Sequence, residues 1–365
     1  MAKKMWFGNC RQCGFPRLVS HLLRWNSDGT INAVFRKGYR VVIFPTEFLD
    51  GLFTNVEDRL GISIRHLVFE AQSNATKVLF EGTPGARLVS RLNLGKRFTV
   101  EFGFNRLASM TGMFRSETLE YVPGSVGIAR ITNPFQLDLA ASIIVGAFEF
   151  LEDCPIEYSW EEDSPNSYVI TVRPTPEESD VAKRLKMEFS PALPGELNCD
   201  RCPRCGVPRA LNHLRWVDEE GIILDRRTGT RVMMSYGYMV TAVFREMAKE
   251  LGEEVNLLLV DAQREWTIRH VGLLGLTTGD EPLGDDELER AYRTYLGDLP
   301  AYGQGNPVTL ELLDPGVRIE VLNPYQKYIM AGTLQGLFEA LEKTGSAVEW
   351  EEGRPGAVTY TITPA

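Results

Sequence analysis

Two pairs of cysteines have the spacing of metal-binding knuckles. Residues 10–16 read CRQCGFP, and residues 202–208 read CPRCGVP. Two cysteines three positions apart, followed by a glycine, let the backbone turn around one ion with both thiolates pointing at it. We expect the glycine to remove a Cβ that would keep the backbone amides from the sulfurs, and the later proline to stiffen the exit from the turn. These residues therefore predict thiolate ligation of a metal.

Four thiolates in two knuckles are the number that one tetrahedral ion requires, as in a rubredoxin-like site built from two facing loops. We predict one shared zinc site, and its four ligands are Cys10, Cys13, Cys202 and Cys205. Zinc is favoured because the sequence shows no redox-partner motif and because four protein ligands leave no open catalytic position. Iron is the alternative metal.

Other interpretations of the cysteines stay open. Each knuckle could hold its own ion with His21 or His213 as a third ligand, because the two histidines follow their knuckles at the same spacing. Cys199 precedes Cys202 by three positions, which gives a three-cysteine run with a spacing reminiscent of iron–sulfur sites. The cysteines could also be free and reduced. Outside a metal site, we expect the two histidines to hydrogen-bond to a thiolate or a carbonyl beneath the knuckle.

No catalytic residues are predicted, because the sequence offers no Ser-His-Asp order, no HExxH and no glycine loop suited to phosphate. Two matching helical segments, EAQ at 70–72 and DAQ at 261–263, could point polar groups into a ligand cavity. Hydrogen bonds from these segments to the neighbouring hairpin are the favoured interpretation. The methionines and aromatics of 107–114 fit an apolar pocket and core packing equally well.

The elements that must position the knuckles occur twice. Cys10 matches Cys202 at an offset of 192 residues, Gly38 matches Gly229 at 191, and the Asn-Pro pair at 133 recurs at 323. An offset that drifts by two residues over a whole unit predicts a tandem duplication. We expect residues 1–174 and 198–365 to be two similar small-molecule-binding-like modules, with 175–197 as the linker.

Each module is predicted to be α+β. Behind its knuckle come a hairpin, two helical stretches, a variable middle, a long amphipathic helix and a closing antiparallel hairpin. The long helix is expected to begin with Asn133 as its cap and Pro134 in its first turn. The expected ranges are strands at 31–35, 40–44, 97–102, 126–131, 222–224, 231–234, 308–313 and 317–322, helices at 47–60, 66–80, 237–251 and 255–274, a turn-rich segment at 280–300, and closing hairpins at 157–172 and 347–362.

The last third of each module resembles a known family. A strand, Asn-Pro-aromatic, a long helix with a glycine in its middle (Gly146, Gly336) and a closing hairpin are similar to the C-terminal half of the vinyl-4-reductase, or hydrocarbon-binding, domain family. That family is related in fold to TRAPP subunits and to haem nitric-oxide-binding domains. The resemblance, best over 133–172 and 323–362, implies a compact module that encloses a small apolar ligand. Many members carry metal-binding cysteines near the closing helix, where this chain has only Cys154, so their metal site is not carried over.

Composition limits the function. With 365 residues, 44% hydrophobic and 10% aromatic, the chain can form two or three domains with substantial cores. The net charge of −10, without any basic run, argues against a nucleic-acid partner. No long apolar run and no signal peptide is visible, so we expect a cytoplasmic protein without a membrane span.

The expected function is therefore a cytoplasmic sensor or carrier of a small apolar or amphipathic ligand. The two repeats would share a structural zinc, and the output would pass to a protein partner. The alternative is an enzyme or accessory subunit of a metabolic complex, in which the knuckles form a rubredoxin-like iron site or an assembly surface.

Overall fold

The computed structural model describes residues 8–34, 38–83, 85–177, 191–277 and 283–365. The predicted α+β class is confirmed, because the described residues form helices and three antiparallel sheets. Residue 35 of the first predicted strand, residues 178–190 of the predicted linker and residues 280–282 of the segment expected to be turn-rich lie outside the described residues. No helix in the described part of the chain is long and apolar enough to cross a membrane.

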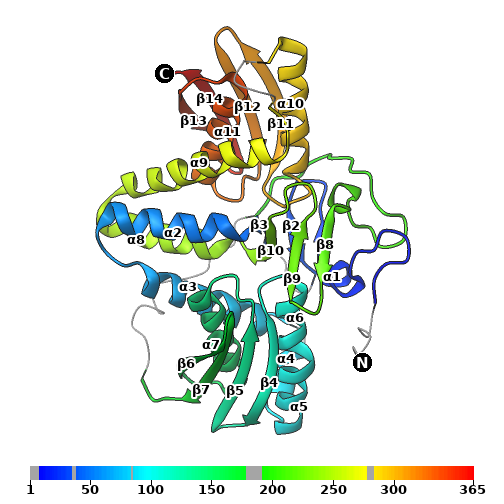
Figure 1. Cartoon of the computed structure of the whole chain (residues 1–365), viewed down its shortest axis with the longest axis vertical. Helices are drawn as coiled ribbons and strands as arrows, with labels where there is room; N and C mark the ends of the chain where they lie inside the picture. The colour runs from blue at the N-terminus through cyan, green and yellow to red at the C-terminus, as the bar shows by residue number, and fades with distance from the viewer. Residues whose placement is uncertain (1–7, 35–37, 84, 178–190, 278–282) are drawn as a thin grey trace.

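A central sheet is built from both halves of the sequence (Figure 1). Its two middle strands pair antiparallel, with Val41 opposite Tyr236 and Pro45 opposite Val232. Val41 and Pro45 lie 191 positions before Val232 and Tyr236, so each strand pairs with its own counterpart in the other half. The pairing is therefore symmetric about the middle of the sheet. In sheet order the strands are β1 (Leu23–Trp25), β2 (Ile31–Ala33), β3 (Arg40–Pro45), β10 (Arg231–Tyr236), β9 (Ile222–Asp225) and β8 (Leu214–Val217).

Two four-stranded sheets lie at opposite ends of the molecule in Figure 1 and have the same strand order. The first contains β4 (Arg115–Val122), β5 (Val126–Thr132), β7 (Ser167–Pro174) and β6 (Ile156–Ser164). The second contains β11 (Asn306–Leu313), β12 (Gly316–Leu322), β14 (Ala357–Pro364) and β13 (Ser346–Glu352). Both predicted closing hairpins are therefore present, and the matching order supports the inference of a duplication.

The long helices α7 (Leu137–Glu152) and α11 (Lys327–Glu342) pack against the closing hairpins. The predicted cap of the first helix is wrong. Asn133 lies before the helix with a φ of 52°, and the cap is Gln136, whose side chain accepts a hydrogen bond from the Leu139 amide at 2.6 Å. The glycine in the middle of this helix allows a close approach, because a Cβ on Gly146 would lie 2.2 Å from the Ser73 carbonyl oxygen.

Helices from the two halves interleave between the sheets. The first half supplies α2 (Thr46–Leu60) and α3 (Arg65–Glu81), and the second supplies α8 (Tyr238–Leu251) and α9 (Leu257–Leu273), with the 3-10 turn η3 (Glu253–Asn256) before α9. Helix α3 packs on α7, and α9 on α11, each within its own half. Helix α2 also contacts α9, and α3 contacts α8. The halves therefore share one large core as well as one sheet.

A tryptophan near the start of each half contacts the middle of the other half. The Trp25 indole donates to the Ala301 carbonyl at 3.0 Å, and the Trp216 indole donates to the Met110 carbonyl at 2.9 Å. The boundaries at 174 and 198 therefore divide two similar stretches of sequence that are joined in space. The division into two modules at these boundaries stays a prediction.

Two predicted segments have a different structure. Residues 97–102, expected to be a strand, fall in α5 (Asn93–Phe98) and the π-helical turn η1 (Thr99–Phe104). Phe98 and Phe102 are four positions apart on one helical face, and their ring centroids lie 5.0 Å apart. Much of the segment expected to be turn-rich is α10 (Asp285–Asp298), which buries apolar residues at helical spacing. The remaining short helices are α1 (Arg17–Leu22), α4 (Ala86–Ser90), α6 (Asn105–Met110) and η2 (Arg209–Leu211).

Candidate metal centre and ligand cavity

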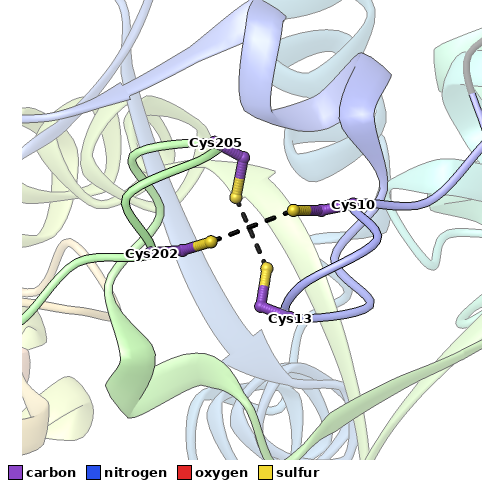
Figure 2. A group of neighbouring side chains, drawn as sticks. All are labelled: Cys10, Cys13, Cys202 and Cys205. Carbon is purple, nitrogen blue, oxygen red and sulfur yellow. Dashed lines mark hydrogen bonds between the residues drawn. The ribbon is translucent and has the colours of Figure 1, made fainter.

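Four cysteine sulfurs from the two knuckles meet at one point (Figure 2). The Cys10 and Cys202 sulfurs are 3.8 Å apart, those of Cys13 and Cys205 are 3.4 Å apart, and all four lie within 4.8 Å of one another. A zinc ion with four sulfurs at about 2.3 Å would place neighbouring sulfurs about 3.8 Å apart. The four cysteines could therefore bind a metal ion, and the donor set is compatible with zinc or iron.

Each knuckle is closed by the same backbone hydrogen bonds. The Cys10 amide donates to the Phe15 carbonyl at 2.8 Å, and the Gly14 amide donates to the Cys10 carbonyl at 2.8 Å; the second knuckle repeats both bonds. Gly14 and Gly206 have φ values of +77° and +74°. A Cβ at either glycine would meet no atom within 4 Å, so the glycine is needed for its backbone angle and not, as expected, to make space.

The four thiols differ in how readily they ionise. Burial acts to raise the pKa of Cys10, but the backbone N–H groups of Cys13 and Gln12 stabilise its thiolate and lower the pKa to about 6. The pKa of Cys202 is also lowered, against the effect of burial, by the matching amides of its own knuckle. Burial and the neighbouring thiols raise the pKa of Cys13 and Cys205. A divalent ion at the centre would favour the thiolate form of all four.

The two other candidate ligand types do not belong to this group. The four-sulfur cluster among the described residues includes neither histidine nor Cys199. The ring of His213 was expected to hydrogen-bond to a thiolate or a carbonyl, but its Nε2 lies 2.8 Å from the Tyr302 hydroxyl and 3.4 Å from the Asp225 carboxylate. Burial raises the pKa of Cys199, which disfavours its thiolate.

The matching EAQ and DAQ segments have a structural role. Gln72 is 1% exposed, and its amide donates to the Thr76 hydroxyl at 3.2 Å; Gln263 donates to the Thr267 hydroxyl at 2.9 Å. Both amides bond within their own helix and not to the hairpin, so the favoured interpretation of these residues is wrong. Asp261 forms an ion pair with Arg59 at 2.6 Å at the surface.

A cavity of about 650 Å³ lies in the first half of the chain. That volume is in the range of about 300–1,000 Å³ that is typical of small-molecule sites. Its walls come from α1, β2, β3, α3, the segment from α4 to α6, α7 and the facing strand β10. Helix α1 directly follows the first knuckle. Apolar wall residues include Leu18, Leu22, Val41, Leu79, Phe104, Leu107, Phe150 and Met234, and polar groups are supplied by Thr83, Thr99, Arg106, Thr111 and Tyr236.

The corresponding place in the second half is nearly filled, with a cavity of about 30 Å³. Several positions that line the first cavity lie 191 residues from positions that line the second. Leu79 corresponds to His270, Thr111 to Tyr302, and larger or more polar side chains occupy the second half in both cases. The remaining matched positions are Val41 and Val232, Pro45 and Tyr236, Thr83 and Leu274, Phe104 and Tyr295, and Leu107 and Asp298. The two halves therefore share a site in sequence register, and only the first leaves a large space there among the described residues.

A buried polar cluster stabilises the side chains that fill the corresponding place in the second half. The Tyr302 hydroxyl lies 3.1 Å from the carboxylate of Asp225, which is 2% exposed. Burial opposes ionisation of Asp225, but His213, the Arg227 backbone amide and the Arg227 guanidinium outweigh it and hold its pKa well below the usual range. Arg227 also pairs with Asp298 on α10. This cluster fixes α10 against the sheet.

His270, beside this cluster, predicts a loss of stability in mild acid. It stacks on Trp266 with ring centroids 4.4 Å apart, and burial, opposed by Asp225 and helped by Arg227, lowers its pKa to about 4. The unfolded imidazole, with a pKa of about 6.5, takes up a proton first, so the free energy of unfolding should fall by up to about 1.4 kcal/mol per pH unit as pH drops from about 6.5 to 4. His270→Leu, which copies Leu79, should reduce this slope in urea unfolding curves.

The matched control is His66→Leu at an exposed position. It should leave the pH slope unchanged. An equal slope in wild type and His270→Leu would show that the proton is taken up elsewhere.

Comparisons with known proteins add partial likenesses. No protein-family model matches the chain, and no curated protein matches it. The crystal structure of the phenol-responsive sensory domain of the transcription activator PoxR with phenol is 16% identical, over 42% of this chain and 86% of that chain, with a TM-score of 0.33. A structure from work on heme distortion in the H-NOX family is 13% identical, over 34% of this chain and 70% of that chain, with a TM-score of 0.26. Membership of the vinyl-4-reductase family is not shown by these comparisons and stays a resemblance.

Proposed function

We propose that this protein is a sensor or carrier that holds one small apolar or amphipathic ligand in the cavity of its first half. The observation that carries this proposal is the 650 Å³ space with largely apolar walls. Transfer of an apolar molecule from water into such a space is favourable in proportion to the area it buries. The few polar groups on the walls would orient a ligand with one polar end.

The second half has a supporting role in this proposal. Its corresponding space is about 30 Å³, too small for an organic ligand, and it contributes Met234 and Tyr236 of β10 to the wall of the first cavity. Ligand binding should therefore saturate at one molecule per chain, although the sequence contains two similar modules.

A structural zinc on Cys10, Cys13, Cys202 and Cys205 completes the proposal. The spacing of the four sulfurs supports a tetrahedral ion held by both halves. When bound, zinc would offset the negative charge of the thiolates and hold the two knuckles rigidly together. It would not be a reactive site, because all four ligand positions are filled by protein. The first knuckle leads directly into α1, whose Leu18 and Leu22 line the cavity, so the joint also fixes one cavity wall.

Native mass spectrometry of the purified full chain tests the proposed function. We expect a retained mass of one organic molecule per chain that disappears after organic extraction. The extracted protein should then bind the apolar fluorophore N-phenyl-1-naphthylamine at one site per chain. A chain that carries no organic mass and gives no saturable fluorescence would contradict the proposal, whatever its metal content.

A further inference from the structure

The outer wall of the cavity is an exposed segment, residues 86–106, made of α4, α5, η1 and the start of α6. Phe98 and Phe102 line the cavity and are nevertheless 58% and 48% exposed, so they lie at its mouth. Their rings contact each other. In the same segment Leu88 is 68% exposed and Leu92 is 59% exposed. Large apolar side chains therefore face water where the cavity opens.

The charge of this segment is opposite to that of the chain. Residues 85–106 contain five basic residues and one acidic residue, whereas the whole chain has a net charge of −10. Lys96 pairs with Glu152 at 2.6 Å. Arg87, Arg91 and Arg97 are exposed at the surface. Each of these three arginines directly precedes one of the exposed apolar residues, Leu88, Leu92 and Phe98.

Exposed arginines that alternate with leucine and phenylalanine on short helices are typical of segments that lie in a membrane interface. Apolar side chains enter the boundary between headgroups and acyl chains, while the guanidinium groups bind lipid phosphates. We propose that residues 86–106 dock on an anionic bilayer surface and that the ligand passes between the bilayer and the cavity through the mouth at Phe98 and Phe102. Docking stands on the exposed residues and their charge, and ligand transfer also rests on the proposed function.

The test is flotation of the full metal-loaded chain with two kinds of vesicle, phosphatidylcholine alone and phosphatidylcholine mixed with phosphatidylserine. We expect binding to the mixed vesicles, weaker binding at high salt, and little binding to phosphatidylcholine alone. Two variants, Phe98→Ser/Phe102→Ser and Arg87→Gln/Arg91→Gln/Arg97→Gln, should each weaken binding by at least about tenfold. The control Arg290→Gln/Arg293→Gln/Arg318→Gln removes three exposed arginines from the other half and should bind like wild type.

The outcomes separate docking from ligand binding. Naphthylamine binding in the absence of vesicles should persist in the arginine variant, because none of its three arginines lines the cavity. If wild type binds the fluorophore but neither kind of vesicle, docking is wrong and the proposed function stands. Equal loss of vesicle binding in the control variant would show that only net charge matters and would overturn the proposal. Binding of residues 86–106 to an acidic protein, but to neither kind of vesicle, would overturn it as well.

Discussion

Cys202→Ser should release the metal and separate the two knuckles. In a shared site the ion loses one of its four ligands, so the metal content should fall from one ion per chain to near zero. Structural zinc contributes folding free energy directly, on the order of 10 kcal/mol in small domains. In this larger chain, which keeps a shared core, we expect the free energy of unfolding to fall by at least about 3 kcal/mol, which corresponds to a fall in Tm of at least about 4 °C. Elemental analysis and calorimetry measure both.

The arrangement of ligands gives this prediction a sharp control. Cys13→Ser, in the other knuckle, should remove the same single ion, whereas Cys199→Ser and Cys154→Ser should leave the metal content and Tm unchanged. Two ions in wild type, with one remaining after each knuckle variant, would show separate sites. A red protein with stoichiometric iron would instead support the rubredoxin-like alternative.

The parts of the structure that were predictable are those that local spacing determines. The knuckles, the closing hairpins and the long helices follow from cysteine spacing, turn residues and apolar period. Helix α10 could also have been predicted, because Leu288, Tyr292, Tyr295 and Leu299 follow helical spacing. The acidic residues between them favour a solvated turn, but the apolar period outweighs them. At 97–102 a short apolar alternation fits either period, so it could not decide between strand and helix.

The pairing of the halves depends on contacts that sequence spacing does not encode. An internal repeat predicts two similar modules, but it does not say whether Trp25 contacts its own module or the other one. The structure places it against Ala301. The difference between the two cavities is equally hidden, because Thr111 and Tyr302 become comparable only once Gly112 and Gly303 are seen in matching contacts with the facing strands. Side-chain volume at such positions decides which half has room for a ligand.

That difference predicts the effect of Thr111→Phe, which places in the first half a ring like that of Tyr302 without adding a hydroxyl that would need a partner. The Thr111 hydroxyl donates to the Leu107 carbonyl at 2.8 Å, but the Thr111 amide donates to the same carbonyl, so the acceptor stays satisfied. We expect naphthylamine affinity to fall at least about 100-fold, because a phenyl ring would occupy apolar space that the ligand needs.

Stability distinguishes this result from simple misfolding. Filling a cavity with an apolar ring commonly stabilises a fold by about 0.5–2 kcal/mol, so the Tm of the extracted Thr111→Phe chain should equal or exceed that of extracted wild type. Ligand binding stabilises wild type by mass action, so ligand-bound wild type should no longer have a lower Tm than the extracted variant. Thr363→Phe, at an exposed position on β14, is the matched control and should keep full affinity. Unchanged affinity in Thr111→Phe would show that the ligand does not occupy the part of the cavity beside Thr111, because the ring and the ligand cannot share that space.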